Sequence, residues 1–379
     1  MRVLLHTPLK PPDSPTPSGD REMARGLARL LRRLGHRLVV PPLSRVATGV
    51  PPPEAHLALE RRARLQAARL IAHWRALPAG HPERFDLWFT YHCYYRKPDW
   101  LGPIVTRALG IPYVLVEASH APRRAQGPTR LGHRAVERAL AAADLVLTVN
   151  PRDLAGVRAR LRPGARQLRL PPFIDTAPFQ AAPHAPPQVP GDPPVLLSVG
   201  MMRTRDKLES YKVLAQAFAL LKDRKWRAVL VGDGPARGEV EALMAPLNED
   251  GCERVRFAGA IPHADLPAFY GKADLYLWPA INEAYGMAFL EAQASGLPVV
   301  AGRTGGVPAV VADGITGLLT PIGDAAAFAA AVARLLDQPV ERARLAAAAS
   351  VRVAAHHDER AAAHALAAAL KTLRGRALS

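Results

Sequence analysis

Short apolar runs alternate with longer segments of helical periodicity along most of the chain. A short apolar run bounded by turn residues predicts a buried strand, and a longer segment with apolar residues three and four apart predicts a helix. A helix is expected over Arg21–Leu34, ended by Gly35 in the C-cap position. In the first half of the chain the expected strands are Val3–His6, Arg37–Val40, Asp86–Tyr91, Tyr113–Glu117 and Leu145–Val149.

A proline-rich segment interrupts this pattern from Pro171 to Pro194. Proline cannot continue a helix or a central strand, so the segment is interpreted as a linker between domains. The alternation then resumes. The expected strands of the second half are Val195–Gly200, Ala228–Val231, Val255–Phe257, Leu275–Trp278, Pro298–Ala301 and Leu318–Thr320.

Two successive series of alternating strands and helices predict an α/β protein with two doubly wound parallel sheets that face a central cleft. The expected divisions are an N-terminal Rossmann-like domain at 1–175, a linker at 176–194 and a second Rossmann-like domain at 195–350. The alanine-rich segment 351–379 is expected to be a helical tail that could pack back on the first domain.

The chain has 379 residues, of which 49% are apolar, so two domains can each bury a core. No run of about 18 apolar residues occurs, so no membrane span is expected. The apolar run near Met1 is too short for a signal peptide, and a cytoplasmic protein is expected. Cys93 and Cys252 lie far apart, which excludes a disulfide framework or a cysteine-based metal site.

The formal net charge is +17, and it is distributed unevenly. Residues 1–175 hold 29 basic and 13 acidic residues, a net charge of +16, whereas residues 176–379 hold 21 and 20, a net charge of +1. Such an excess is typical of proteins that meet nucleic acid, an anionic membrane or an anionic substrate. Most of the basic residues are arginine, so a GC-rich genome is an alternative explanation. No nucleic-acid-binding motif accompanies the charge, and no nucleic-acid partner is expected.

Several common chemistries are excluded by missing motifs. The sequence has no P-loop, no G-x-S-x-G nucleophile elbow and no D-x-D metal clamp. The turn Gly232–Gly238 follows a strand, but its last glycine comes one position too late for a dinucleotide fingerprint and Pro235 interrupts it. His92 and Cys93 should point to opposite faces of a strand, which favours a packed cysteine. His357 and its two neighbours are expected on a solvated surface.

The segment 279–320 carries the most information. A loop with Glu283 and Gly286 follows the strand that ends at Trp278, and a helix should run from near Met287 to Gly296. A glycine allows a ligand close to the backbone, and Glu291, one turn into the helix, could accept hydrogen bonds from the paired hydroxyls of a ribose. Glu283 could do the same for a hexose. Eight helical residues span roughly 12 Å, beyond the roughly 9.5 Å limit for glycosidase carboxylates, which favours two separate binding roles.

This segment resembles the family 4 retaining glycosyltransferases of the GT-B fold, the bacterial-type group 1 glycosyl transferases. Glu283 and Glu291 match the family's E-x7-E pattern, and Glu283–Met287 stands where E-G-F-G-L is usual. The resemblance extends to the family's glycine turn, its pre-linker signature, its Gly-rich first loop and its strand ending in the active-site histidine. These are matched by Val231–Pro235, Leu170–Phe179, Ser18–Asp20 and Ile111–His120.

The resemblance implies a role for each matching residue. Glu291 would bind the donor ribose, and Glu283 with the amides of Tyr285, Gly286 and Met287 would hold the transferred sugar. Lys207 corresponds to the phosphate-binding lysine, and His120 would lie beside the reacting sugar. Gly200 and Gly232 would approach the donor, and Gly19 the donor phosphate or the acceptor. His92 and Asp20 are acceptor-side candidates; for His92 an ordinary structural role is an alternative. Met201 replaces the family's usual arginine, so Arg203 or Arg205 could supply that charge.

The implied reaction is retaining transfer of a sugar from a nucleotide-diphosphate sugar, with no metal and no other cofactor. The alternatives are a catalytically weak nucleotide-sugar-binding module and a module bound to a membrane surface. Residues 54–77 form an amphipathic helix that could bind a membrane or dock on its own sheet. Its apolar side would carry Leu59, Leu70, Ile71, Trp74 and Leu77, and its basic side Arg61, Arg62, Arg69 and Arg75. The charge of the first half predicts an anionic acceptor or peripheral binding at the inner face of an anionic membrane.

Overall fold

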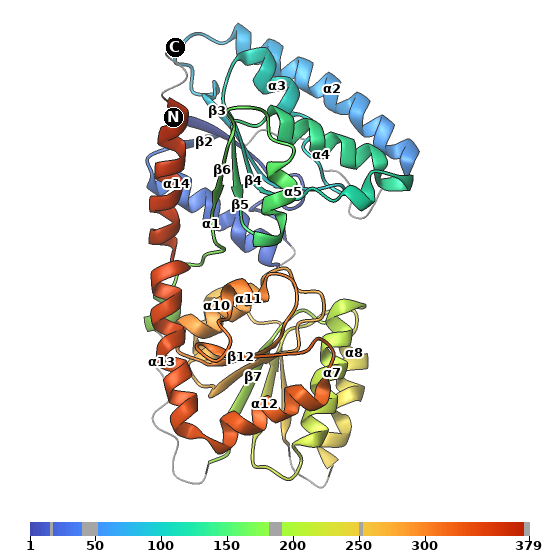
Figure 1. Ribbon diagram of the computed structural model, residues 1–379, viewed down its shortest axis with the longest axis vertical. Coiled ribbons are helices and arrows are strands. Elements are labelled where there is room, and N and C mark those ends of the chain that lie inside the picture. Colours follow the sequence, from blue (N-terminus) through green and yellow to red (C-terminus); the bar gives the residue numbers. More distant parts are fainter. Residues whose placement is uncertain (16–17, 40–51, 182–191, 250–252, 375–379) are drawn as a thin grey trace. The chain divides into compact units, whose positions relative to one another are not determined.

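The computed structural model describes residues 1–15, 18–39, 52–181, 192–249 and 253–374 (Figure 1). The chain divides into two compact units. Unit 1 comprises Met1–Pro171 and the segment that begins at Glu359, and unit 2 comprises Pro172–Asp358. Each unit is built on one parallel sheet of six strands, as the alternating pattern predicts. In the described part of the chain no helix is both long and apolar enough to cross a membrane.

In unit 1 the strand order is β2-β1-β3-β4-β5-β6. Helices α1 and α14 pack side by side, whereas α2, α3 and α4 pack on one another (Figure 1). The strands are β1 Arg2–His6, β2 Arg37–Val39, β3 Leu87–Cys93, β4 Tyr113–Ala118, β5 Leu145–Thr148 and β6 Arg166–Arg169. The helices are α1 Gly19–Arg33, α2 Pro53–Ala76, α3 Gly102–Leu109, α4 Arg130–Ala142, α5 Leu154–Arg158 and α14 Glu359–Arg374.

In unit 2 the strand order is β12-β11-β10-β7-β8-β9. Helix α7 packs beside α8 and α12, and α10 packs beside α9 and α13. The strands are β7 Val195–Val199, β8 Arg227–Val231, β9 Val255–Gly259, β10 Leu275–Trp278, β11 Val299–Gly302 and β12 Gly317–Thr320. The helices are α6 Ala177–Ala181, α7 Asp206–Leu220, α8 Arg237–Met244, α9 Leu266–Tyr270, α10 Met287–Ala294, α11 Val307–Val310, α12 Ala325–Asp337 and α13 Pro339–His356.

The order of strands reverses once in each sheet, between β1 and β3 in unit 1 and between β7 and β10 in unit 2. Helices leave these neighbouring strands toward opposite faces, so the loops at their carboxyl ends separate and open a crevice where ligands of doubly wound sheets bind. The topology therefore marks one candidate site in each unit.

Every strand expected from the apolar runs is present, with ends that differ by one or two residues. Strand β6 was missed. Its residues Arg166–Arg169 are mostly exposed, and the strand pairs only with β5 at the edge of the sheet. An edge strand with little buried surface has no apolar run to reveal it.

The segment expected to be a linker is partly folded. Helix α6 lies within 176–194 and buries Phe179, while residues 182–191 lie outside the described residues. The division expected at residue 350 falls inside α13, and the boundary of unit 2 comes later, at Asp358.

The end of α13 is fastened to the segment that follows β6. The Ile174 amide donates to the His357 carbonyl (2.9 Å), and Nδ1 of His357 lies 2.7 Å from the Pro172 carbonyl. The Thr176 hydroxyl donates to Asp358 (2.5 Å). His357 is only 2% exposed, so the prediction of a solvated surface is wrong for this residue, whereas the neighbouring His356 is exposed as predicted. The two chain segments that leave unit 2 run side by side at this point, and the imidazole fills the space between them.

One side of helix α2 packs against the core of unit 1. Leu70, Ile71 and Trp74 pack against the core of unit 1, as the amphipathic pattern predicts. The opposite side carries exposed arginines and also two exposed apolar side chains that the pattern did not single out, Leu57 (50%) and Leu65 (63%).

A buried carboxylate organises the sheet of unit 1. Asp99 accepts hydrogen bonds from Thr90 (2.6 Å), Tyr113 (2.8 Å) and Trp88 (3.0 Å) and caps α3 through two backbone amides. Burial alone would raise the pKa of Asp99, but nearby His6 and these hydrogen bonds hold it below its usual value. Burial lowers the pKa of His6, whose ring lies 3.5 Å from Asp99.

Candidate functional site

The crevice of unit 2 brings Lys207 and Glu283 together. Lys207 lies in the first turn of α7, after β7, and Glu283 lies in the loop after β10. The Lys207 ammonium donates to Glu283 Oε2 (2.5 Å) and lies 5.0 Å from the ring centre of Trp278. The two side chains are 29% and 18% exposed, so the pair is partly desolvated but open to a ligand.

Glycines determine the shape of the loop that carries Glu283. Gly286 precedes α10 with φ +73°, and a Cβ there would collide with the ring of Phe289. Gly305 and Gly306 lie against the carbonyls of Glu283 and Ala284 so closely that neither has room for a side chain. The Gly306 amide donates to the Ala284 carbonyl (2.7 Å). The predicted start of a helix at Met287 is confirmed, while Tyr285 is nearly buried.

Glu291 is held from two sides. Its Oε2 accepts from the Tyr270 hydroxyl (2.8 Å), and its Oε1 lies 2.9 Å from Nε2 of His263. The residue is 5% exposed, whereas the His263 side chain is 42% exposed. Burial, and then the Glu291 charge, raises the pKa of Tyr270 well above its usual value, so its hydroxyl remains a donor.

The partners of Glu291 were missed by sequence reasoning. The ring of Phe179 packs edge-on to Tyr270 (5.7 Å between centres) and to His263 (6.0 Å). Phe179 ends the segment Leu170–Phe179, which matches the family's pre-linker signature. Its role here is to support the two side chains that hold Glu291.

Gly200 and Gly232 serve backbone packing at the ends of β7 and β8. Gly232 has φ +145°, and a Cβ on it would collide with the Gly200 carbonyl. A Cβ on Gly200 would meet the Trp278 ring at 3.2 Å. Arg203 and Arg205, the two candidates for the missing phosphate-binding arginine, are both exposed, and it is Lys207 that contacts Glu283; the role of either arginine stays a prediction.

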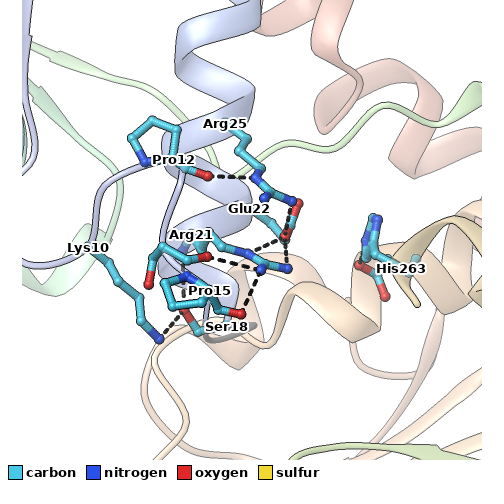
Figure 2. Close-up of polar contacts among 10 residues, drawn as sticks. Lys10, Pro12, Pro15, Ser18, Arg21, Glu22, Arg25 and His263 are labelled. Atoms are coloured by element: carbon cyan, nitrogen blue, oxygen red, sulfur yellow. Dashed lines mark hydrogen bonds and ion pairs between the residues drawn. The ribbon is translucent and has the colours of Figure 1, made fainter. Parts of the chain in front are cut away.

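The crevice of unit 1 begins with the loop between β1 and α1, which Figure 2 shows in detail. Ser18 caps α1 by accepting from the Arg21 amide (3.2 Å), and Lys10 donates to the same hydroxyl (2.9 Å). The Arg21 guanidinium, itself 9% exposed, donates to the Ser14 and Pro15 carbonyls. These bonds fix the loop beside the first turn of α1, where Gly19 and Asp20 lie.

His92 and Asp20, both predicted on the acceptor side, lie together in this crevice. His92 Nδ1 is 3.8 Å from Asp20 Oδ1, and the imidazole packs on Tyr94 with 4.9 Å between ring centres. Asp153, after β5, lies near His92: burial raises the pKa of Asp153, while a hydrogen bond from Ser119 and the nearby His92 oppose that shift. Cys93 is fully buried and burial raises the pKa of its thiol to about 12, so the predicted packed cysteine is confirmed.

His120 lies after β4 and its side chain turns inward, with 3% exposed. Its Nε2 is 3.2 Å from Glu137 Oε1 and 3.2 Å from Nε of Arg160, and its ring packs on that of His133 (4.9 Å). Gly156 lies over it, since a Cβ there would come 3.2 Å from the His120 carbonyl. Sequence reasoning found the residue but not this cluster.

Backbone strain marks both crevices. Among the described residues five non-glycine residues have positive φ, which L-residues rarely adopt outside functional sites. They are His92, Glu117, Arg205, Ala280 and Asn282. All five lie in or after the carboxyl ends of strands, namely β3, β4, β7 and β10, and of these strands β3, β7 and β10 border the points at which the two sheets reverse their order.

Comparison with known proteins agrees with this geometry. Residues 193–338 match the family model of the glycosyl transferases group 1. The chain is 30% identical over 253 residues to the GDP-mannose-dependent alpha-(1-6)-phosphatidylinositol monomannoside mannosyltransferase of Mycolicibacterium smegmatis, covering 63% of this chain and 64% of that protein. It is 41% identical over 138 residues to a D-inositol 3-phosphate glycosyltransferase of Corynebacterium glutamicum, covering 35% and 32%. The alignments thus span less than two thirds of either relative.

Solved structures match over nearly the whole chain. Sucrose-phosphate synthase from Thermosynechococcus elongatus aligns over 99% of both chains, with a TM-score of 0.74 and 22% identity. Anabaena HepE in complex with UDP and glucose aligns over 98% of this chain and 99% of that one, with a TM-score of 0.68 and 18% identity. These neighbours establish the GT-B fold. Residues 193–338 therefore match a group 1 glycosyl transferase domain, and the chain has the GT-B fold of two Rossmann-like units.

Proposed function

We propose that the protein transfers a sugar from a nucleotide-diphosphate sugar to a hydroxyl acceptor, with retention of anomeric configuration and without a metal. The observation that carries this proposal is the pair of differently held glutamates at one sheet edge. Glu291 is fixed by Tyr270 and His263, as a residue that must present its oxygens to a ribose diol should be. Glu283 is paired with a cation, and its side chain is more exposed (18%) than that of Glu291 (7%).

In this proposal Lys207 and Glu283 have different roles. Cleavage of the sugar–phosphate bond places negative charge on the leaving diphosphate, and the Lys207 ammonium would stabilise it. Glu283 keeps the ammonium in place before the donor binds, and its oxygens would accept hydrogen bonds from sugar hydroxyls. Both glutamates accept hydrogen bonds from neighbouring side chains, which argues against a covalent sugar–enzyme intermediate. Retention is proposed from the resemblance of Glu283 and Glu291 to the E-x7-E pattern.

The donor is tested with UDP-, GDP-, ADP- and dTDP-sugars in a thermal-shift panel. A ligand at 100 times its dissociation constant stabilises the folded state by about 2.7 kcal/mol, so one nucleotide should raise the melting temperature clearly above the others. With that donor, NMR of the product reports the anomeric configuration, and activity should survive EDTA. Stabilisation by none of the donors would contradict the proposal, an inverted product would contradict retention, and loss of activity in EDTA that Mg²⁺ restores would contradict metal independence.

Helix α2 supports a second proposal, that the protein binds peripherally to the surface of an anionic membrane. Leu57 and Leu65 are exposed on the side of α2 that also carries exposed Arg61, Arg62 and Arg69. Apolar side chains between cations are typical of helices that lie on a membrane surface. Vesicles with 30% phosphatidylserine should sediment the protein at low salt, and replacing the three arginines by glutamine should abolish sedimentation. Equal sedimentation of both proteins would contradict a role for α2.

A further inference from the structure

Five half-buried side chains surround the crevice of unit 1, and we call them the polar edge: Asp20, His92, Tyr94, Ser119 and Asp153. They come from four places along the chain: the first turn of α1, the end of β3, the loop after β4 and the turn before α5. Only the topological reversal between β1 and β3 brings the first two together. The location is the one where doubly wound sheets bind ligands.

The contacts within the polar edge leave hydrogen-bonding capacity toward a ligand. His92 Nδ1 is buried and makes no hydrogen bond within the described part of the chain; the nearest carboxylate oxygen, on Asp20, is 3.8 Å away. Asp20 itself is 43% exposed. His92 also has φ +70°, a conformation that costs energy and is retained where surrounding structure requires it. His92 Nδ1 therefore has no hydrogen-bonding partner in the described part of the chain, and the carboxyl groups of Asp20 and Asp153 both lie in its vicinity.

The chemistry of the polar edge selects among ligands. Carboxylate oxygens accept hydrogen bonds from hydroxyls and attract ammonium groups, and they repel phosphates. The ring of Tyr94 offers an apolar face of the kind on which the C–H side of a sugar or cyclitol ring can stack. Arg21 and Arg152 adjoin Asp20 and Asp153 in the sequence, but the Arg21 guanidinium donates to the Ser14 and Pro15 carbonyls and pairs with Glu22, and Arg152 is exposed. Arg96 and Arg124 lie over the ring of Tyr95.

We propose that the polar edge binds the acceptor, and that this acceptor is a hydroxylated ring that is uncharged or carries an amine, not a phosphorylated one. Asp20 and Asp153 accept from its hydroxyl or ammonium groups, and His92 takes a third hydroxyl. This inference rests on the proposed function, because the ligand of the polar edge is an acceptor only if the protein transfers a sugar. It replaces the expectation of an anionic acceptor that the charge of the first half suggested.

The test measures binding directly, so it does not depend on turnover. Saturation-transfer NMR is recorded on the full chain with three probes: methyl α-glucoside, glucosamine and glucose 6-phosphate. The variants Asp20→Asn and Asp153→Asn keep the shape of each side chain and remove its charge. Glu83→Gln is the matched control, because Glu83 is exposed and precedes β3, at the opposite end of the strand.

Glucosamine and the glucoside should bind, with glucosamine weakened about tenfold or more by either aspartate variant, as expected when a hydrogen bond to a charged group is lost. The control should bind as the unchanged protein does. Tighter binding of glucose 6-phosphate, binding of no probe, or aspartate variants that bind all probes unchanged would each overturn the inference. The donor panel is a separate measurement, so its failure would sink the proposed function and not this binding result.

Discussion

Replacing Lys207 by methionine is the sharpest test of the assignment in unit 2. The substitution keeps the length of the side chain and removes its charge. In the folded protein the ammonium meets one carboxylate oxygen of Glu283 at 2.5 Å, in a pair that is 29% and 18% exposed. Two different consequences follow, one for stability and one for catalysis, and they differ in size.

The stability cost should be modest. An exposed ion pair contributes about 0.2–1 kcal/mol and a hydrogen bond to a charged group about 1.5–3 kcal/mol, so a partly exposed pair should contribute about 1–2 kcal/mol. For a domain of this size, 1 kcal/mol corresponds to about 2–4 °C. The variant should therefore melt about 2–8 °C lower and remain folded at 25 °C.

The catalytic cost should be much larger. Loss of one group that stabilises developing negative charge lowers kcat by about 10²–10³, or about 2.7–4 kcal/mol. The matched control is Lys212→Met on the same helix, where the lysine pairs with Glu209 at 2.8 Å and both side chains are about half exposed. That variant should keep kcat within about twofold.

Initial rates with the best donor of the panel, together with melting curves of both variants, test whether Lys207 stabilises the leaving diphosphate. If Lys207→Met keeps kcat within about threefold, the phosphate role is refuted. If the Lys212 variant loses as much activity as the Lys207 variant, the effect belongs to the helix and the charge argument fails.

Three further predictions address the loop, the buried glutamate and the core. Gly286→Ala should abolish donor binding and lower the melting temperature, whereas Gly314→Ala, also at positive φ but with open space around it, should cost only about 1 kcal/mol; equal effects on binding by calorimetry would refute the steric argument. Tyr270→Phe should weaken nucleotide-sugar binding about tenfold by removing one donor to Glu291, and unchanged affinity would mean that the hydroxyl does not position the carboxylate. Because the pKa of His6 is lowered by burial, the unfolded chain takes up a proton at His6 before the folded protein does. Urea unfolding should therefore show stability falling as pH drops below about 6.5, and His6→Gln should flatten that slope; an unchanged slope would refute the assignment.

The fold could be predicted because it depends on local patterns. Buried parallel strands are continuous apolar runs, and turn residues separate them from amphipathic helices. Strand β6 lies at a sheet edge and buries little, so Arg166–Arg169 carry no such pattern. His357 was misjudged for a related reason. Nothing in the neighbouring residues shows that the segment at Pro172 returns to pack beside it.

The site was predictable to the extent that single residues carry a motif. The motifs single out Glu283, Glu291 and Lys207, whose roles stay predictions, and the structure adds the ion pair between Glu283 and Lys207. Tyr270 and His263 were not found, because their contact with Glu291 joins segments more than 20 residues apart. A pairing of this kind depends on how α9 packs on α10, which a single sequence does not encode in any local pattern.

The net charge of +16 on residues 1–175 differs in sign from the charges that a ligand in the crevice of unit 1 meets. Exposed charges farther away than about 8–10 Å are largely screened at physiological salt. Many of the arginines are exposed on the surfaces of helices such as α2, where they act on whatever approaches that surface. A ligand in the crevice of unit 1 instead meets Asp20 and Asp153 at hydrogen-bonding distance, where their interaction is least screened. The same half of the chain can therefore attract an anionic membrane with its helices and still select an uncharged or amine-bearing acceptor at its sheet edge.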